Sequence, residues 1–368
     1  MRLVDTRRTD RATAGPVRPR VGREPLSGRV TCPGRWDDVQ QNQAMRAAYI
    51  ERPGPAAGIR VGDLPTPRPG PTDVLVDVIV TTVNPVDTFV RSGAYPTALP
   101  LPFVVGRDLV GRVVETGPGA AGFRAGDLVW CNSLGYDGRQ GSAAAQAVVP
   151  VDRLYRLPSG VDPATAVTVL HPAATAYLAL FVHGRLRPGE TVVVAGGAGN
   201  VGAALVALAA TAGARVVATA SAADADYCRR RGATDVLDYR APDVVDRLRT
   251  ACPDGIDVYL DTSGRNELEP VIDLLARRGR IVLLAGAATR PVLPVGALYQ
   301  NDRAVLGFVI SHATVAELAE AAGLVNRMLA GGRLAPREVV PLPLSATGQA
   351  HRMLEQGELR GRRVVIRP

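Results

Sequence analysis

The sequence predicts an α/β protein with two domains, one β-rich and one built on a doubly wound parallel sheet. The chain has 368 residues, which is too many for one hydrophobic core and suits two domains. Hydrophobic residues make up 46% of it, enough to fill both cores. Short strands separated by turn residues come first, and strands alternating with helices follow from residue 167.

Residues 1–44 are expected to form a disordered tail. They contain Arg, Pro, Gly and Asp without periodicity and few large apolar side chains, so they bury too little surface to offset the entropy of ordering. Met45 begins the stretch MRAAYIERPG, which resembles a fresh start. Two alternatives stay open: Met45 is the true initiator, or the tail is a native extension.

The segment from 45 to about 166 has the pattern of a β-rich domain with long loops. The stretch VLVDVIVTTV at 74–83 alternates as a strand does, and GDLV at 126–129 opens another strand. Turn-rich stretches at 91–93 and 115–127 separate them.

The segment after 167 alternates between strands and helices. Strands are predicted at 191–196, 215–220, 235–238, 257–261, 280–285 and 305–310. Helices are predicted at 201–212, 224–232, 242–251 and 267–278, with a further helix at 314–331. Alternation of this kind predicts a parallel, doubly wound sheet.

Composition excludes several functions. The chain contains no lysine, so Schiff-base chemistry at a lysine is excluded. The net charge is +8, but residues 1–44 carry nine Arg and five acidic residues, so half of the charge lies in the tail and nucleic acid is not expected as a partner. No apolar run spans a bilayer without a charge or a Pro/Gly break, and no signal peptide is evident, so a cytoplasmic protein without a membrane partner is expected.

The four cysteines, Cys32, Cys131, Cys228 and Cys252, lie far apart. This spacing argues against a zinc knuckle and against a disulfide framework. Small buried thiols are expected.

A glycine-rich motif follows the predicted strand at 191–196 and opens the next helix. It matches G-x-G-x-x-G over Gly197, Ala198, Gly199, Asn200, Val201 and Gly202. In a strand–helix–strand unit this motif binds a dinucleotide: one glycine makes a sharp turn, one lets the backbone approach a pyrophosphate, and one lets helix pack on strand. The free N–H groups of the helix then hold the phosphates.

The residue after the second strand of this unit indicates which dinucleotide binds. NAD sites place a carboxylate there, whereas this chain has Ser221. A 2′-phosphate is therefore not repelled, and NADPH is favoured. The predicted partners of that phosphate are Ser221, Arg229, Arg230, Tyr239 and Arg240. If Asp224 or Asp226 faces the ribose instead, the preference reverses.

Five stretches together carry a family resemblance: MRAAYIERPG from 45, NPVDTFVRSGAYP at 84–96, AGGAGNVG at 195–202, GATDVLDYR at 232–240 and DVYLDTSG at 257–264. With them, residues 45–368 resemble the medium-chain dehydrogenase/reductase superfamily, and within it the zeta-crystallin-like NADPH:quinone oxidoreductases. The resemblance implies a GroES-like catalytic domain over 45–166 and 311–368, split around a Rossmann NADP-binding domain over 167–310. It also implies a homodimer, and the apolar strand at 305–310 is the expected pairing edge.

The resemblance implies a reductase without zinc. Zinc-dependent relatives have Cys where this chain has Asn84, and Gly-His-Glu where it has Gly106, Arg107 and Asp108. Asn and Arg do not replace zinc ligands. Hydride transfer to an electron-poor acceptor, a quinone or an α,β-unsaturated carbonyl, does not need the metal.

The resemblance also implies roles for three polar residues. Asn84 would hydrogen-bond the substrate or the nicotinamide ribose, Tyr95 would bond the carbonyl oxygen or relay a proton, and Thr175 would lie near the nicotinamide. Plainer alternatives are a turn at Asn84, a loop contact at Tyr95, and a Thr175 hydroxyl bonded to its own helix. Asp87 is expected to be a structural acceptor and His171 a structural histidine.

Two rival functions stay open. The charged pair Arg107 and Asp108 departs from many relatives and puts a plain quinone substrate in doubt. One rival is an enoyl-thioester or enone reductase of a biosynthetic pathway. The other is a non-catalytic, crystallin-like protein that binds a nucleotide or RNA.

Overall fold

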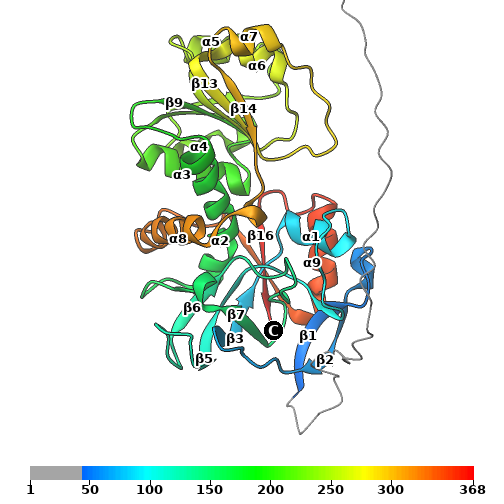
Figure 1. The fold of residues 1–368 in the computed structure, drawn as a ribbon. Coiled ribbons are helices and arrows are strands. Elements are labelled where there is room, and N and C mark those ends of the chain that lie inside the picture. The colour runs from blue at the N-terminus through cyan, green and yellow to red at the C-terminus, as the bar shows by residue number, and fades with distance from the viewer. Residues whose placement is uncertain (1–43) are drawn as a thin grey trace, which may run out of the picture. The chain divides into compact units, whose positions relative to one another are not determined.

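The computed structural model describes residues 44–368 (Figure 1). The predicted tail therefore lies outside the described residues, apart from Ala44. The first strand, β1, runs over Ala44–Ile50 and so includes both Ala44 and Met45.

The β-rich part of the chain contains two sheets. A three-stranded sheet has the order β2-β1-β4, and a seven-stranded sheet has the order β15-β16-β3-β5-β6-β8 with β7 paired to β3. Their strands are β1, β2 (Arg60–Pro65), β3 (Asp73–Thr81), β4 (Phe103–Val104), β5 (Leu109–Thr116), β6 (Leu128–Cys131), β7 (Gln146–Pro150), β8 (Tyr155–Arg156), β15 (Val339–Pro343) and β16 (Arg363–Arg367). The predicted strands at 74–83 and 126–129 correspond to β3 and β6.

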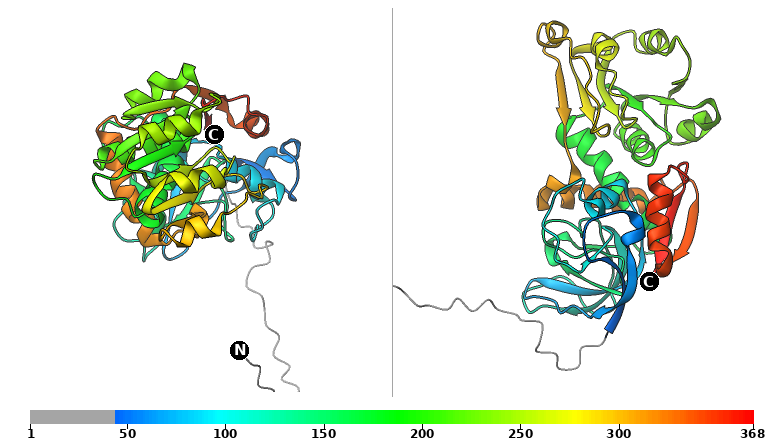
Figure 2. Two further views of the ribbon diagram at one scale, coloured as in Figure 1. Left: turned by 90° about the horizontal axis from the view of Figure 1, so that it is seen from above. Right: turned by 90° about the vertical axis from the view of Figure 1, so that its right-hand side faces the viewer.

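The last strand of the chain returns to the first part of this sheet. In β16, Ile366 pairs with Thr81 of β3, and the Thr82 hydroxyl donates to the Val364 carbonyl at 2.6 Å. The helix α1 (Pro85–Ser92) follows β3 in the chain, and α9 (Thr347–Glu355) precedes β16. The C-terminus lies in the β-rich part of the molecule (Figure 2). Residues that are far apart in sequence therefore meet beside Thr82.

The second half of the chain forms a six-stranded parallel sheet of order β11-β10-β9-β12-β13-β14. Its strands are β9 (Thr191–Ala195), β10 (Arg215–Ala220), β11 (Asp235–Asp238), β12 (Ile256–Asp261), β13 (Leu275–Leu283) and β14 (Ala304–Gly307). Its helices are α3 (Asn200–Thr211), α4 (Ala225–Arg230), α5 (Val244–Ala251), α6 (Leu268–Leu274) and α7 (Val295–Tyr299). The predicted α/β fold, with a doubly wound parallel sheet beside a β-rich part, is confirmed.

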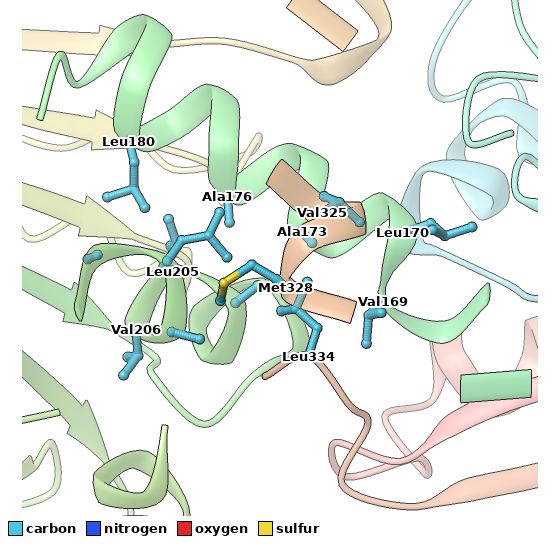
Figure 3. Close-up of a cluster of buried hydrophobic side chains, with 14 of the residues drawn as sticks. Val169, Leu170, Ala173, Ala176, Leu180, Leu205, Val206, Val325, Met328 and Leu334 are labelled. Atoms are coloured by element: carbon cyan, nitrogen blue, oxygen red, sulfur yellow. The ribbon is translucent and has the colours of Figure 1, made fainter. Parts of the chain in front are cut away.

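Alternating residues of the strands fill two cores, one on each face of the parallel sheet. Val192 and Val194 point into a core shared with α2 (Pro163–Tyr177), α3 and α8 (Val315–Ala330). Val193, between them, points into the opposite core with α5 and α6. Figure 3 shows the first core, where Leu205 of α3 and Met328 of α8 meet.

The helix α2 is the longest apolar run in the described residues. It continues through a π-helical turn at Leu178–His183, and by length and composition 163–183 could cross a membrane, although Pro172 interrupts the apolar run. However, 72% of its most apolar window is buried inside the protein, as befits a core helix. It contacts both β3 and α3, and the predicted domain boundary at 166–167 lies inside it.

Two predicted elements were wrong at their ends. The helix predicted at 267–278 stops at Leu274, and β13 begins at Leu275 with an irregular register against β12 and a positive φ at Arg278. The strand predicted at 305–310 ends at Gly307, because the Phe308 ring leaves the sheet to stack on His183 and Ile310–His312 forms a helical turn. The other predicted helices agree with α3, α4, α5 and α8 to within a few residues.

Candidate active site

The glycine motif forms a tight turn between β9 and α3. Gly196, just before the motif, has φ +83° and makes the sharp turn. A Cβ on Gly202 would lie 2.1 Å from the Gly196 carbonyl oxygen, and one on Gly197 would lie 2.8 Å from the Ala218 Cβ. Gly199 caps the helix, which begins at Asn200. The predicted glycine functions therefore fit this turn, but the sharp bend belongs to Gly196, which the motif alone did not single out.

A pocket opens at the carboxyl ends of β9, β10 and β12. Gly196, Thr219, Tyr239, Asp261 and Arg265 are among its lining residues. In the sheet order, β9 lies between β10 and β12, so the strand order reverses at this point, where ligands bind in open α/β sheets. The pocket and the start of α3 together can hold a dinucleotide.

The loop after β12 is built around one carboxylate. Asp261 accepts hydrogen bonds from the backbone N–H groups of Ser263, Gly264 and Asn266 at 2.7, 3.1 and 2.9 Å. Asp261 is buried, and its hydrogen bonds fix the DTSG stretch as one wall of the pocket.

Ser221 is engaged by a neighbouring carboxylate. Its hydroxyl donates to Asp224 Oδ2 at 2.8 Å, and Arg337 Nη1 donates to Asp224 Oδ1 at 2.7 Å. Asp226 instead pairs with Arg229 at the surface. Of the two aspartates, therefore, Asp224 is the one beside Ser221, and Arg337 balances its charge.

Two arginine side chains lie over the ring of Tyr239. The guanidinium groups of Arg240 and Arg265 lie 5.2 and 5.1 Å from the centre of its ring. Arg240 and Tyr239 were predicted from the sequence, whereas Arg265 was not. Two arginines near this ring raise the local affinity for an anion.

Asn84 lies in a buried cluster of charged and polar side chains. It is 1% exposed, its Nδ2 donates to Asp108 Oδ2 at 3.2 Å, and Arg363 Nη2 donates to its Oδ1 at 2.7 Å. Asp87 accepts the Asn84 backbone N–H at 2.7 Å and so caps α1, as expected of a structural acceptor. The side-chain amide is already engaged at both ends, so a bond from Asn84 to substrate stays a prediction.

Burial shifts the pKa values of this cluster. It raises the pKa of Asp87 to about 6 against the lowering effect of Arg107. It also raises the pKa of Asp108 well above its usual range, and Asp87 adds to that rise. Burial lowers the pKa values of Arg107 and Arg363, and the two aspartates oppose that change. The cluster thus favours the neutral form of Asp108 more strongly than that of Asp87, beside two arginines.

Tyr95 belongs to a cluster of aromatic rings, with Tyr136 and His312, that was not predicted from the sequence. Its hydroxyl is 3.2 Å from His312 Nε2, and its ring stacks on Tyr136 with centroids 5.6 Å apart. Arg107 lies 5.5 Å from the centre of the Tyr136 ring and donates to the Ser311 hydroxyl at 3.0 Å. Tyr95 therefore adjoins the charged cluster through Tyr136 and Arg107.

Thr175 and His171 lie one helical turn apart in α2. The Thr175 hydroxyl donates to the His171 carbonyl at 2.9 Å, so it bonds its own helix, as the plainer alternative expected. A position of Thr175 near the nicotinamide stays a prediction. The His171 ring lies 3.8 Å from Asp108. Arg363 and Asn200 line one small cavity with Pro172, so the charged cluster adjoins the start of α3.

The residues at the positions of the zinc ligands do not fit zinc. Asn84 and Arg107 supply an amide and a guanidinium instead of thiolate and imidazole. Within residues 44–368, no group of three or more His, Cys, Asp or Glu side chains could hold a metal ion. The described cysteines, Cys131, Cys228 and Cys252, are buried free thiols.

Comparisons with known proteins agree with this architecture. Residues 70–159 match the alcohol dehydrogenase GroES-like domain family, and residues 200–327 match the family described as zinc-binding dehydrogenase. Quinone oxidoreductase of Mus musculus is 28% identical over 327 residues, covering 88% of this chain and 97% of the mouse protein.

Solved structures of similar proteins have the same fold. An NAD-dependent alcohol dehydrogenase is 30% identical with a TM-score of 0.78, and 88% of this chain and 100% of that one are covered. A mycobacterial protein in complex with NADPH is 28% identical with a TM-score of 0.76, with the same coverage. The fold and the glycine turn define an oxidoreductase that depends on a nicotinamide dinucleotide. The chain belongs to the medium-chain dehydrogenase/reductase family, and quinone oxidoreductases are among the proteins that it resembles.

Proposed function

We propose that the protein is an NADPH-dependent reductase that transfers hydride to a quinone or to an α,β-unsaturated carbonyl compound without zinc. The proposal rests on the presence of two features in one chain. One is the dinucleotide turn at Gly196–Gly202, and the other is a buried cluster around Asn84 whose residues do not suit a metal ion. The turn fits a nicotinamide dinucleotide, whereas Arg107 stands where zinc-dependent relatives have a ligand.

When bound, the nicotinamide cofactor supplies the hydride. For an enone, the hydride adds to the β-carbon and one proton adds to the α-carbon, so NADPH, a proton and the enone give NADP⁺ and the saturated ketone. The chain's own residues orient the acceptor and stabilise the negative charge that develops on its oxygen. The Tyr95 hydroxyl is the predicted donor to that oxygen, and the positive charges of Arg107 and Arg363 favour the same step.

The preference for NADPH rests on three arginines, of which Arg265 lines the pocket and the other two lie near Ser221 and Tyr239. Arg337 adjoins Asp224 and Ser221, and Arg240 and Arg265 flank Tyr239. A 2′-phosphate is attracted by these three arginines and opposed by the Asp224 carboxylate, whose charge Arg337 offsets only in part.

The test is a steady-state comparison of NADPH and NADH, following loss of the reduced nicotinamide with quinones, enones and enoyl thioesters in turn. We expect a higher kcat/KM with NADPH and turnover of quinones or enones. Asp224→Ser removes the opposing carboxylate and should raise kcat/KM for NADPH by about tenfold, leaving NADH unchanged. The matched control is Asp226→Ser, because Asp226 pairs with Arg229 at the surface. Equal use of both cofactors by wild type and Asp224→Ser would refute the NADPH preference.

A further inference from the structure

Arg107 is a buried cation whose hydrogen-bonding capacity is mostly unused. The residue is 1% exposed, and its Nη1 donates to the Ser311 hydroxyl. Its Nε and Nη2 atoms have no hydrogen-bond partner within residues 44–368. Buried arginines are normally paired or fully bonded, so two idle donors on such a side chain call for an explanation.

The charges around Arg107 do not fully balance it. No carboxylate of the described residues forms an ion pair with it, although Asp87 and Asp108 act on it at longer range. Arg363 is a second buried cation in the same cluster. Burial favours the neutral form of Asp108, which leaves two arginines opposite one ionised carboxylate, Asp87. The cluster then carries an uncompensated positive charge.

The edge of this cluster offers a donor to a ligand. Ser311 accepts a hydrogen bond from Arg107, so its own hydroxyl hydrogen is free to be donated, and the side chain is half-buried. The Arg107 guanidinium also lies over the ring of Tyr136, which stacks on Tyr95, the predicted donor to the reacting carbonyl. An anionic group at Ser311 and Arg107 would therefore lie next to the predicted reaction site.

We propose that Arg107 and Ser311 form a carboxylate-binding subsite, so that the preferred acceptor is an α,β-unsaturated carbonyl compound that also carries a carboxylate. The carboxylate supplies the missing negative charge and accepts from the half-buried Ser311 hydroxyl, which the buried Arg107 guanidinium orients. This inference rests on the proposed function, since it names the substrate class of the same site. It explains why a guanidinium with idle donors occupies a buried position at Arg107.

The test compares a matched pair of enones, 4-oxopent-2-enoate and its methyl ester, with saturating NADPH. We expect wild type to prefer the acid over the ester in kcat/KM. Arg107→Leu should reduce the acid-to-ester ratio by roughly 10- to 100-fold, the effect of removing a hydrogen bond to a charged group, and Ser311→Ala by less. Arg107→Lys should restore part of the ratio. Arg91→Leu is the matched control, because Arg91 is equally buried but bonds Glu355 and the Gly54 carbonyl, and it should keep the wild-type ratio.

A second measurement does not depend on turnover or on a folded Arg107→Leu protein. Levulinate, the saturated acid, should raise the unfolding temperature of the NADP⁺-loaded wild type, whereas methyl levulinate should not, and Ser311→Ala should weaken the effect. Equal reduction and equal binding of acid and ester by wild type would overturn the subsite, as would a preference that persists in Arg107→Leu. Turnover of quinones with no acid preference would defeat the subsite and leave the reductase standing. Arg107-dependent binding of levulinate without turnover of any acceptor would support the subsite and defeat the proposed function.

Discussion

His171 Nδ1 lies 3.8 Å from Asp108 Oδ1, and neither atom has a hydrogen-bond partner within residues 44–368. The His171 ring also forms a hydrogen bond with the backbone of Asn132. Burial lowers the pKa of His171 well below its usual range and so favours the neutral imidazole. A carboxylate oxygen and a bare ring nitrogen repel each other when they are buried together. A proton on Asp108 turns the repulsion into a hydrogen bond, which agrees with the raised pKa of that carboxyl.

Asp108→Asn should therefore stabilise the protein at high pH. A carboxyl whose pKa is raised by folding costs no stability below its unfolded pKa of 3.8, and the cost grows as the pH rises from there toward the folded value. The amide cannot ionise, so the variant escapes that cost. We expect similar unfolding free energies at pH 4, and a variant more stable by on the order of 1–2 kcal/mol at pH 8. Thermal or urea unfolding at both pH values measures the difference.

Asp127→Asn is the control, because it should change stability at high pH in the opposite direction. Hydrogen bonds from Arg156 and the Arg124 backbone lower the pKa of Asp127, so that carboxylate stabilises the protein above its unfolded pKa. Its variant should lose stability at pH 8 relative to pH 4. A destabilised Asp108→Asn at pH 8 would show that the ionised carboxylate, favoured by the nearby charges of Arg363 and Arg107, is the native form.

Gly202→Ala should weaken both folding and cofactor binding. The new Cβ would lie 2.1 Å from the Gly196 carbonyl oxygen, which belongs to backbone and cannot move without opening the turn. We expect a loss of about 1–3 kcal/mol in unfolding free energy and at least a tenfold rise in the Kd for NADPH. Titration of NADPH fluorescence and thermal unfolding measure the two effects.

Gly296→Ala is the matched control for that glycine. Gly296 also lies in a helix, α7, and a Cβ there would meet nothing within 4 Å. It should leave NADPH binding unchanged and unfolding within about 1 kcal/mol of wild type. If Gly202→Ala binds NADPH as wild type does, α3 does not hold the cofactor in the way proposed.

The local parts of the site were predictable from the sequence because their signals are local. The motif at Gly197–Gly202, with a β-branched strand before it and a helix after it, required no long-range contact. Ser221 followed from its spacing to that motif. Even there, the turning glycine was missed, because a motif does not show which glycine takes φ +83°.

The charged cluster was not predictable, because its members meet only in the folded chain. Arg363 bonds Asn84 across a separation of 279 residues, and His312 meets Tyr95 across 217. No periodicity or spacing predicts such pairs. The pairing of β16 with β3, which brings Arg363 to Asn84, depends on the whole sheet.

Tyr95→Phe tests the predicted proton donor. Loss of the hydroxyl that contacts His312 should lower kcat for a neutral quinone by roughly 10- to 100-fold with KM nearly unchanged, since the bond to the acceptor oxygen strengthens in the transition state. Tyr177→Phe, which removes a hydroxyl bonded to Glu320, should keep the wild-type kcat. An unchanged kcat in Tyr95→Phe would reduce Tyr95 to a packing residue stacked on Tyr136.

The last prediction concerns the open edge of the parallel sheet. In the described residues β14 pairs only with β13, and exposed apolar side chains lie just before it in the chain, where Val292, Leu293, Val295 and Tyr299 are 41–66% exposed. An open strand edge beside an apolar patch favours association, so we propose a homodimer formed across this edge.

Sedimentation of wild type should therefore show a dimer at micromolar concentration. The double variant Val292→Asp, Val295→Asp places two like charges at the interface and should shift the species to monomer while circular dichroism stays that of wild type. Val114→Asp is the control, because Val114 is an exposed valine of β5 in the other sheet, and it should remain dimeric. A monomeric wild type would refute the dimer. A dimer that survives both aspartates would place the contact on a different surface, because two buried, unpaired carboxylates cost more than such an interface gains.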